Sequence, residues 1–355
     1  MRKLLPGVTK VVLAPEPLGP QLEPPRPTGA ADYLAVMPSV TEEVIFERLL
    51  EAVWGTEGQA TGRITHIYLL PFLANGGAEQ ATFNYIEACN TIPGYRALII
   101  TTDRPSPMAG GIELPIAARH LAMAEATERL VPEERKRILF RIVNAVAPDV
   151  IHIVNSDLGW QILSERGVKL QKLSRIFASI FALQFEGPGR QLTGYAAIYL
   201  KDAWQFISTL LTDNESFAKS AKSLFATDES RDVRTLYNPP RIVAQTRVTP
   251  QHGVPLQLLW AGRLDTEKRL DLLLETASLA PQHQFHVFGS RVVDGGQRDP
   301  LHGAPPNVHF HGPFSAPLDL LAKGPYHGFI FTSRWEGMPN ILLEVGMLGV
   351  PIVAH

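Results

Sequence analysis

Short runs of apolar residues, separated by longer mixed segments, dominate the chain from about residue 63 to residue 240. The runs are rich in Ile, Val, Leu and aromatic residues, and most of the intervening segments are long enough to form helices. Strands that are apolar on both faces and alternate with helices are typical of a parallel sheet covered on both sides. The pattern therefore predicts strands in RITHIYLLP, YRALIITTD, DVIHIVN, RIFASIFA, WQFISTLLTD and VRTLYNPP.

The same rhythm restarts after residue 255. It predicts strands in LQLLWAG, QFHVFG, VHFHG, GFIFTS and PIVA, and a helix in EKRLDLLLETASLA. A polar segment with several prolines, residues 239–255, separates the two sets and is interpreted as a hinge. We therefore expect an α/β protein with two Rossmann-like domains facing across a cleft, formed by residues 63–240 and 241–355.

The first 62 residues follow neither rhythm. Residues 1–38 contain eight prolines, which favours an extended arm. Ser39 and Glu42 have the spacing of a capping box, and the segment that follows is predicted to be a helix. Its apolar positions at helical spacing are Val44, Leu49, Leu50 and Val53. We expect this helix to be an appendage that packs on the main body or on a partner.

Composition narrows the class of protein. The chain of 355 residues is 45% hydrophobic and 19% charged, with a formal net charge of -2, which describes a globular protein and gives no indication of nucleic-acid binding. Its one cysteine, Cys89, excludes an internal disulfide and fits a reducing compartment. No apolar run is long enough to span a bilayer, and Pro6 interrupts the opening MRKLL, so neither a membrane span nor a signal peptide is expected. These features predict a cytoplasmic protein.

A basic cluster lies in PEERKRILFRIV, residues 132–143, and consists of Arg135, Lys136, Arg137 and Arg141. It offers a route for peripheral attachment to the inner membrane. A solvated helix face explains the same residues more simply.

The first candidate binding motif is LLPFLANGGAEQATFNYIEAC. Here Gly76 and Gly77 stand between the end of a predicted strand and the start of a predicted helix. Glycines let the backbone approach a ligand closely, and a helix N-terminus presents free N–H groups to an anion. A βα turn without a ligand explains the glycines equally well.

The second motif, LLWAGRLDTEKRLDLLL, carries Arg263 and Lys268 just after a predicted strand. A planar guanidinium and a compact ammonium could together hold a diphosphate and stabilise the charge that forms on it when a bond breaks. Read alone, these residues also fit a solvated loop and helix start.

The third motif, TSRWEGMPNILLEVGMLGVPIVA, places Glu336 in a loop and Glu344 in the helix that follows. Because Glu344 has apolar neighbours on both sides, its carboxylate requires hydrogen-bond donors such as ribose hydroxyls. The backbone N–H groups of Gly337, Met338 and Asn340 lie where a helix begins and could meet a phosphate.

These three segments carry a family resemblance. GGAE (76–79), AGRLDTEKRLDLLLE (261–275) and SRWEGMPNILLEVGMLGVPIVA (333–354) resemble, in order and spacing, the retaining glycosyltransferases of the GT-B fold, family 4 (glycosyltransferase group 1). The last segment contains the family's E-x7-E pattern, from Glu336 to Glu344. The resemblance extends over residues 63–355.

The resemblance implies a role for each candidate residue. Arg263 and Lys268 would bind the diphosphate of a nucleotide sugar, and Glu336 would bind hydroxyls of the transferred sugar; these three are the expected catalytic residues. The remaining binding residues would be Gly76, Gly77, Gly337, Met338, Pro339, Asn340 and Glu344. Gly76 and Gly77 would approach the donor phosphates or the acceptor, and Glu344 would bind the ribose. It further implies transfer with retention of configuration, no metal ion and no cofactor. A glycan or lipid-linked acceptor in bacterial cell-surface polysaccharide synthesis would be the destination. The nucleotide stays open among UDP, GDP, dTDP and ADP.

The chain also departs from the family pattern. The histidine that many relatives carry after the fourth strand is missing from SIFALQFEGPG, and the family continues past GVPIVA whereas this chain stops at His355. We therefore expect an incomplete C-terminal domain, whose exposed edge would favour self-association or a partner chain. A non-catalytic GT-B scaffold that binds a partner or glycan is the second interpretation. The retained Arg263, Lys268, Glu336 and Glu344 favour the enzyme.

Overall fold

The structure is a computed structural model that describes residues 39–54, 62–74, 76–106, 112–186, 191–225, 232–239, 255–290, 301–314, 319–320, 324 and 326–354. The predicted arm at residues 1–38 and nearly all of the predicted hinge lie outside these residues.

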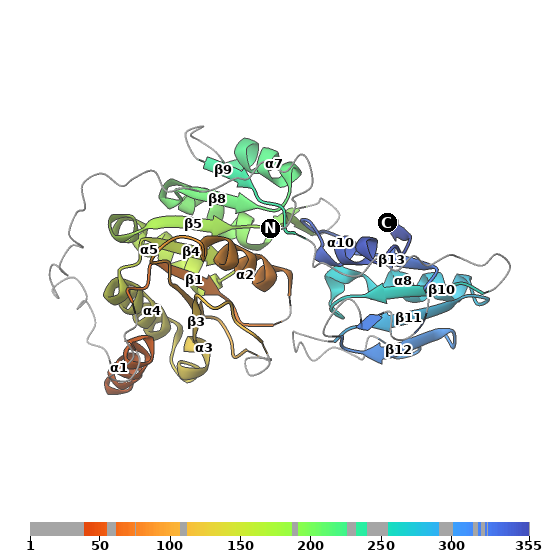
Figure 1. The fold of residues 1–355 in the computed structure, drawn as a ribbon, viewed down its shortest axis with the longest axis horizontal. Coiled ribbons are helices and arrows are strands. Elements are labelled where there is room, and N and C mark those ends of the chain that lie inside the picture. The colour runs from red at the N-terminus through yellow and green to blue at the C-terminus, as the bar shows by residue number, and fades with distance from the viewer. Residues whose placement is uncertain are drawn as a thin grey trace. The chain divides into compact units, whose positions relative to one another are not determined.

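A seven-stranded parallel sheet occupies the first part of the chain, in the order β3-β2-β1-β4-β5-β8-β9 (Figure 1). Its strands are β1 (His66–Leu70), β2 (Ala97–Thr101), β3 (Ala118–Leu121), β4 (Val150–Val154), β5 (Arg175–Ser179), β8 (Thr209–Thr212) and β9 (Asp232–Thr235). All six predicted strands are confirmed. The pattern missed β3 because ARHL is short and half polar. It also missed the antiparallel pair β6 (Gln184–Glu186) and β7 (Gln191–Thr193).

Helices cover both faces of this sheet. Successive residues of β1 point to opposite faces, and because both sets are apolar, both faces need a covering layer. Tyr68 and Leu70 share a core with Ile86 of α2, whereas Leu69 faces Gly159 of α5. The helical segments described in this part are α2 (Gly77–Cys89), α3 (Met123–Ala126), α4 (Pro132–Val146), α5 (Asp157–Leu173), η2 (Ala196–Leu200), α6 (Lys201–Ala203), η3 (Trp204–Phe206) and α7 (Glu215–Phe225).

A second parallel sheet has five strands in the order β12-β11-β10-β13-β14. They are β10 (Gln257–Ala261), β11 (Gln284–Phe288), β12 (Val308–Gly312), β13 (Gly328–Phe331) and β14 (Ile352–Ala354), and each was predicted from the sequence. Leu259 of β10 packs with Val345 of α10 (Asn340–Met347). Trp260 packs on the opposite face with Leu273 of α8 (Leu270–Leu279), which the short helix η4 (Thr266–Lys268) precedes.

Both sheets have the strand order of a Rossmann-like domain, with the first strand at the centre and the order reversing beside it. The reversal lies between β1 and β4 in the first sheet and between β10 and β13 in the second. Ligands of such folds bind beyond the carboxyl ends of the strands at this reversal. The loops after β1, β10 and β13 are therefore the places to look for a site.

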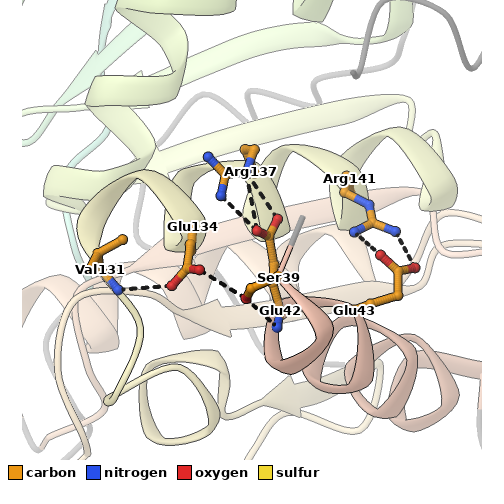
Figure 2. Close-up of polar contacts among 7 residues, drawn as sticks. All are labelled: Ser39, Glu42, Glu43, Val131, Glu134, Arg137 and Arg141. Atoms are coloured by element: carbon orange, nitrogen blue, oxygen red, sulfur yellow. Dashed lines mark hydrogen bonds and ion pairs between the residues drawn. The ribbon is translucent and has the colours of Figure 1, made fainter. Parts of the chain in front are cut away.

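The predicted appendage is α1 (Val40–Trp54), and it docks on α4 through charged side chains (Figure 2). Arg137 donates to both carboxylate oxygens of Glu42, with a closest distance of 2.7 Å, and Glu42 is fully buried. Arg141 binds both oxygens of Glu43 at 2.7 and 2.8 Å and stacks over the ring of Phe46. This helix therefore packs on the main body, one of the two arrangements predicted for it.

Two details of α1 differ from prediction. The Ser39 half of the capping box is present, since the Glu42 N–H donates to Ser39 Oγ at 3.1 Å. The Glu42 carboxylate is directed to Arg137 instead of back to Ser39, because burial against α4 requires a cationic partner. Leu49 and Val53 are buried as expected, but Val44 is 40% exposed.

The basic cluster of α4 is not the solvated face that seemed the simpler interpretation. Arg135 donates to the carbonyl oxygens of Thr102 and Asp103, and Lys136 is buried with ion pairs to two glutamates. Intramolecular contacts thus hold all four cations of the cluster, including the Arg137 and Arg141 that bind α1. Membrane attachment through this helix stays a prediction. Within the described residues, every helix is too short or too polar to cross a bilayer.

Candidate functional site

All three sequence motifs follow strands beside a reversal of strand order. Gly76 and Gly77 come after β1, Arg263 and Lys268 come after β10, and the segment 332–340 follows β13. The carboxyl ends of parallel strands share one edge of a sheet, so the last two motifs meet at the same edge. The fold thereby brings together residues that are about 70 positions apart in the chain.

The cations of the second motif are already paired inside the protein. Arg263 Nε lies 3.2 Å from Asp265 Oδ2, and its Nη2 pairs with Glu267. Lys268 ends η4, and its Nζ pairs with Oε1 of Glu336 from the loop after β13. Two predicted site residues, Lys268 and Glu336, are therefore in direct contact.

A buried hydrogen-bond chain holds the two loops in register. Trp260 Nε1 donates to Thr332 Oγ1 at 2.9 Å, and this hydroxyl donates to the Lys268 carbonyl oxygen at 2.6 Å. Trp260 and Thr332 are each 3% exposed. A further bond at 2.8 Å joins Arg334 N to the Glu267 carbonyl oxygen. Neither Trp260 nor Thr332 was predicted as a site residue, although both lie at or beside the ends of predicted strands.

The third motif continues into α10. Pro339 is the residue before the helix, and Asn340 begins it. Asn340 Oδ1 is buried and accepts no hydrogen bond from any described residue, so this oxygen is free to accept one from a ligand. Glu344 lies half-buried beside the fully buried Val345 and already interacts within the protein.

The first motif contains a buried acid that was not predicted as a site residue. Glu79 is 6% exposed, and a Cβ atom on Gly76 would lie only 2.5 Å from its Oε2, so the carboxylate lies over Gly76. Burial raises the pKa of Glu79 to about 7, although backbone N–H groups of Glu79 and Ala74 and the charges of Arg263 and Arg104 oppose the shift. A buried carboxylate thus lies at the start of α2, against the backbone of Gly76.

The first and third motifs lie close together. A Cβ atom on Gly77 would be 3.7 Å from Asn340 Nδ2, which is ordinary van der Waals contact. The N-termini of α2 and α10 are therefore neighbours. The side chain of Asn340 therefore lies beside the start of α2.

Asp213, which follows β8, is a second acid that was not predicted from the sequence. It is 4% exposed, and its Oδ2 accepts a hydrogen bond from Met338 N at 2.9 Å. Burial raises its pKa, and the charge of Glu336 acts in the same direction, while the hydrogen bonds from Met338 and Asn214 oppose the shift. Its place at the carboxyl end of the predicted strand WQFISTLLTD was the available signal, but no surrounding motif singled it out.

The arrangement has a definite chemical capacity. Arg263 and Lys268 offer cationic donors for phosphate oxygens, and Glu336 and Asn340 offer acceptors for hydroxyl groups. Among the described residues, no three His, Cys, Asp or Glu side chains are grouped so that they could hold a metal ion. Such a set of groups suits an anion that carries neighbouring hydroxyl groups.

Comparison with known proteins finds a family match for the segment that contains the second sheet. Residues 255–355 match the family model described as glycosyl transferases group 1. Over this segment the chain is similar to the group 1 glycosyltransferases. Arg263, Lys268, Glu336 and Glu344 all lie inside the matched segment.

A curated protein is similar to part of the chain. A lipopolysaccharide 1,6-galactosyltransferase of Salmonella typhimurium is 28% identical over 136 residues, which is 35% of this chain and 37% of that relative. The aligned segment therefore spans little more than a third of the curated relative's length.

Solved structures show the fold over a larger part of the chain. The lipopolysaccharide outer core galactosyltransferase WaaB superposes with a TM-score of 0.56 and 18% identity, covering 82% of this chain and 80% of that one. Anabaena HepE, solved with UDP and glucose, gives a TM-score of 0.54 at 15% identity with the same coverage. The expected GT-B fold with two Rossmann-like sheets is confirmed.

Proposed function

We propose that this chain transfers a sugar from a nucleotide-diphosphate sugar to a glycan or lipid-linked acceptor, with retention of configuration and without a metal ion. The contact between Lys268 and Glu336 carries the proposal, because it joins a phosphate ligand to a hydroxyl ligand at the reversal of strand order. A diphosphate and the sugar attached to it would need these two groups side by side.

The chemistry assigned to the residues follows from their charges. The bond between the anomeric carbon and the diphosphate oxygen breaks, and Arg263 and Lys268 stabilise the negative charge that the diphosphate gains. The acceptor oxygen bonds to the anomeric carbon on the same face, and a leaving phosphate oxygen accepts the acceptor's proton. Glu336 holds hydroxyls of the transferred sugar while this happens.

The relatives suggest where to look for the substrates. One is named a galactosyltransferase of lipopolysaccharide, and another was solved with UDP and glucose. We therefore propose a UDP-hexose donor and a role in bacterial cell-surface polysaccharide synthesis, at the cytoplasmic face of the inner membrane.

The test has a binding arm and a transfer arm. Isothermal titration with UDP, GDP, dTDP and ADP should show one preferred diphosphate. Transfer from the matching labelled sugar nucleotide should persist in EDTA, and the anomeric proton coupling of the product should report retention. Absence of binding by all four diphosphates would refute the donor site, and an inverted product or loss of activity in EDTA would refute the proposed mechanism.

A non-catalytic scaffold is the second candidate. The segment after β5 favours this candidate, because it begins with Ile180 and Phe181 and lacks the histidine that many members of the family carry there. A scaffold would bind glycan in the absence of nucleotide and would show no thermal stabilisation by any nucleoside diphosphate. The same titrations therefore separate the two candidates.

A further inference from the structure

Asp213 connects the first sheet to the loop that carries Glu336. Its Oδ2 accepts the backbone N–H of Met338 at 2.9 Å, and its Oδ1 accepts from Asn214 Nδ2 at 3.0 Å. Asn214 is itself fixed, because its side chain donates to the Phe181 carbonyl oxygen at 2.9 Å and accepts from Phe217 N at 2.7 Å. The carboxylate is therefore held from its own sheet and directed at a backbone amide of the other.

Gly337 gives an independent indication that the loop rests on this carboxylate. A Cβ atom on Gly337 would overlap both Asp213 Oδ1 and the carbonyl oxygen of Phe181. The Phe181 oxygen belongs to the backbone and cannot rotate away. Only glycine allows this approach, so the loop backbone lies directly against the ends of β5 and β8.

The contact matters because of what else the loop carries. Glu336 immediately precedes Gly337, and its carboxylate pairs with Lys268. Fixing the Gly337–Met338 backbone therefore fixes where Glu336 and Lys268 stand relative to the first sheet. An ionisable group that is 4% exposed needs such hydrogen bonds, so the amide of Met338 also stabilises Asp213.

We infer that Asp213 is a positioning residue for the sugar-transfer site: its carboxylate holds the Gly337–Met338 backbone against the first sheet and so sets the position of Glu336 and Lys268. The effect of Asp213 on catalysis rests on the proposed function, whereas the contact between Asp213 and Met338 is independent of it. Asp213 acts through the loop and is not expected to touch the substrate.

The test uses variants on both sides of the contact in the full chain. Asp213→Ala removes the acceptor, and Asp213→Asn keeps one oxygen that can accept the Met338 amide. Gly337→Ala changes the loop side of the contact, because the added methyl group would push the loop backbone away from Asp213 and Phe181. Gly346→Ala is the matched control, because its nearest contact outside its own helix would be Ile352 Cδ1 at 4.0 Å. Circular dichroism checks that each variant folds.

The primary measurement is hydrogen exchange of the Met338 amide, which is independent of activity. Asp213→Ala and Gly337→Ala should exchange about tenfold faster than wild type, the effect of losing one hydrogen bond of about 1.4 kcal/mol. Gly346→Ala should remain close to wild type, and Asp213→Asn should lie between wild type and Asp213→Ala, because its single oxygen can accept from Met338 or from Asn214 but not from both. Unchanged exchange in Asp213→Ala would overturn the inference.

Kinetics with UDP-glucose and UDP-galactose as probes test the consequence. Asp213→Ala and Gly337→Ala should lower kcat by up to about 10²-fold, the scale of a small misplacement in a reacting site, with a much smaller change in KM for the donor. Tighter UDP binding and faster turnover in Asp213→Ala would mean that the carboxylate competes with the donor, and would refute positioning. If wild type transfers no sugar, the proposed function fails, whereas hydrogen exchange still decides the contact.

Discussion

At the residue scale, the charged groups of the candidate site are engaged with one another. Arg263 binds Asp265 and Glu267, and Lys268 binds Glu336. A diphosphate that enters must compete with these carboxylates for the same cations. Its net gain in binding energy is therefore smaller than the gross attraction between the opposite charges.

Arg263→Ala and Lys268→Ala should each weaken UDP binding by roughly 1.5–3 kcal/mol, the scale of a hydrogen bond to a charged group. Uridine, which lacks the phosphates, should bind all three proteins alike. Isothermal titration measures both ligands. Wild-type affinity for UDP in both variants would show that the cations bind something else.

The two glutamates of the third motif should behave differently. Glu336→Gln releases Lys268 from its ion pair, so UDP should bind at least as tightly as to wild type while turnover falls. Glu344→Gln should weaken binding of UDP itself, because Glu344 is assigned to the ribose. Equal changes of UDP affinity in the two variants would contradict this division of roles.

Glu79 should make stability depend on pH. Its pKa of about 7 in the folded protein lies above the ordinary value of 4.5, so the folded state holds the proton more tightly than the unfolded state. The stability that this group contributes is present below pH 4.5 and is lost as the pH rises through 7. Glu79→Gln should therefore gain about 1–3 kcal/mol relative to wild type between pH 5 and pH 8, at about 1.4 kcal/mol per unit of pKa shift.

Urea unfolding at both pH values measures that gain. Glu87→Gln, which alters an exposed glutamate of the same helix, serves as the matched control. A pH-independent difference between Glu79→Gln and wild type would show that Glu79 is not held in its protonated form.

At the scale of elements, α1 shows how a helix can be predicted while its docking is not. Its boundaries follow from Ser39 and from the spacing of Leu49 and Val53. Its orientation on α4 depends on pairs such as Glu42 with Arg137, which are 95 residues apart. No local pattern indicates which distant arginine a glutamate will meet.

Glu42→Gln should lower the free energy of unfolding by about 3 kcal/mol, because it leaves the largely buried Arg137 without a counter-charge. Glu43→Gln, on the same helix with a side chain that is 41% exposed, should cost only about 0.2–1 kcal/mol. Urea unfolding compares the two. Similar losses would show that burial does not decide the strength of these pairs.

At the scale of the whole molecule, the two Rossmann-like sheets are joined by contacts near Gly77, Asp213 and Met338. Among the described strands, the second sheet ends at β14, whose Ile352 and Val353 side chains are 39% and 64% exposed. Unpaired edges with apolar side chains favour pairing between molecules.

We therefore expect the 355-residue chain to self-associate through β14. Val353→Lys should shift it toward monomer, because a lysine on an edge strand opposes pairing. Val168→Lys replaces a valine that is 59% exposed on α5, away from this edge, and should leave association unchanged. Sedimentation velocity over a concentration series measures both, and a monomeric wild type would contradict the expectation.

The sequence by itself determined the order and type of most elements and the position of the motifs. Buried parallel strands have continuous apolar sequences, and the segment after each such run lies at the carboxyl end of a strand. For that reason the apolar pattern alone is enough to assign Gly76, Arg263 and Glu336 to the edge of the sheets where ligands of such folds bind.

Only the tertiary structure decided which distant groups meet and how deeply they are buried. Lys268 meets Glu336 across 68 positions, and Asp213 meets Met338 across 125. The altered pKa of Glu79 comes mainly from desolvation, which depends on everything packed around it. Long-range contacts and burial depend on the assembled core and not on any local stretch of chain, so they cannot be predicted from periodicity or motif spacing.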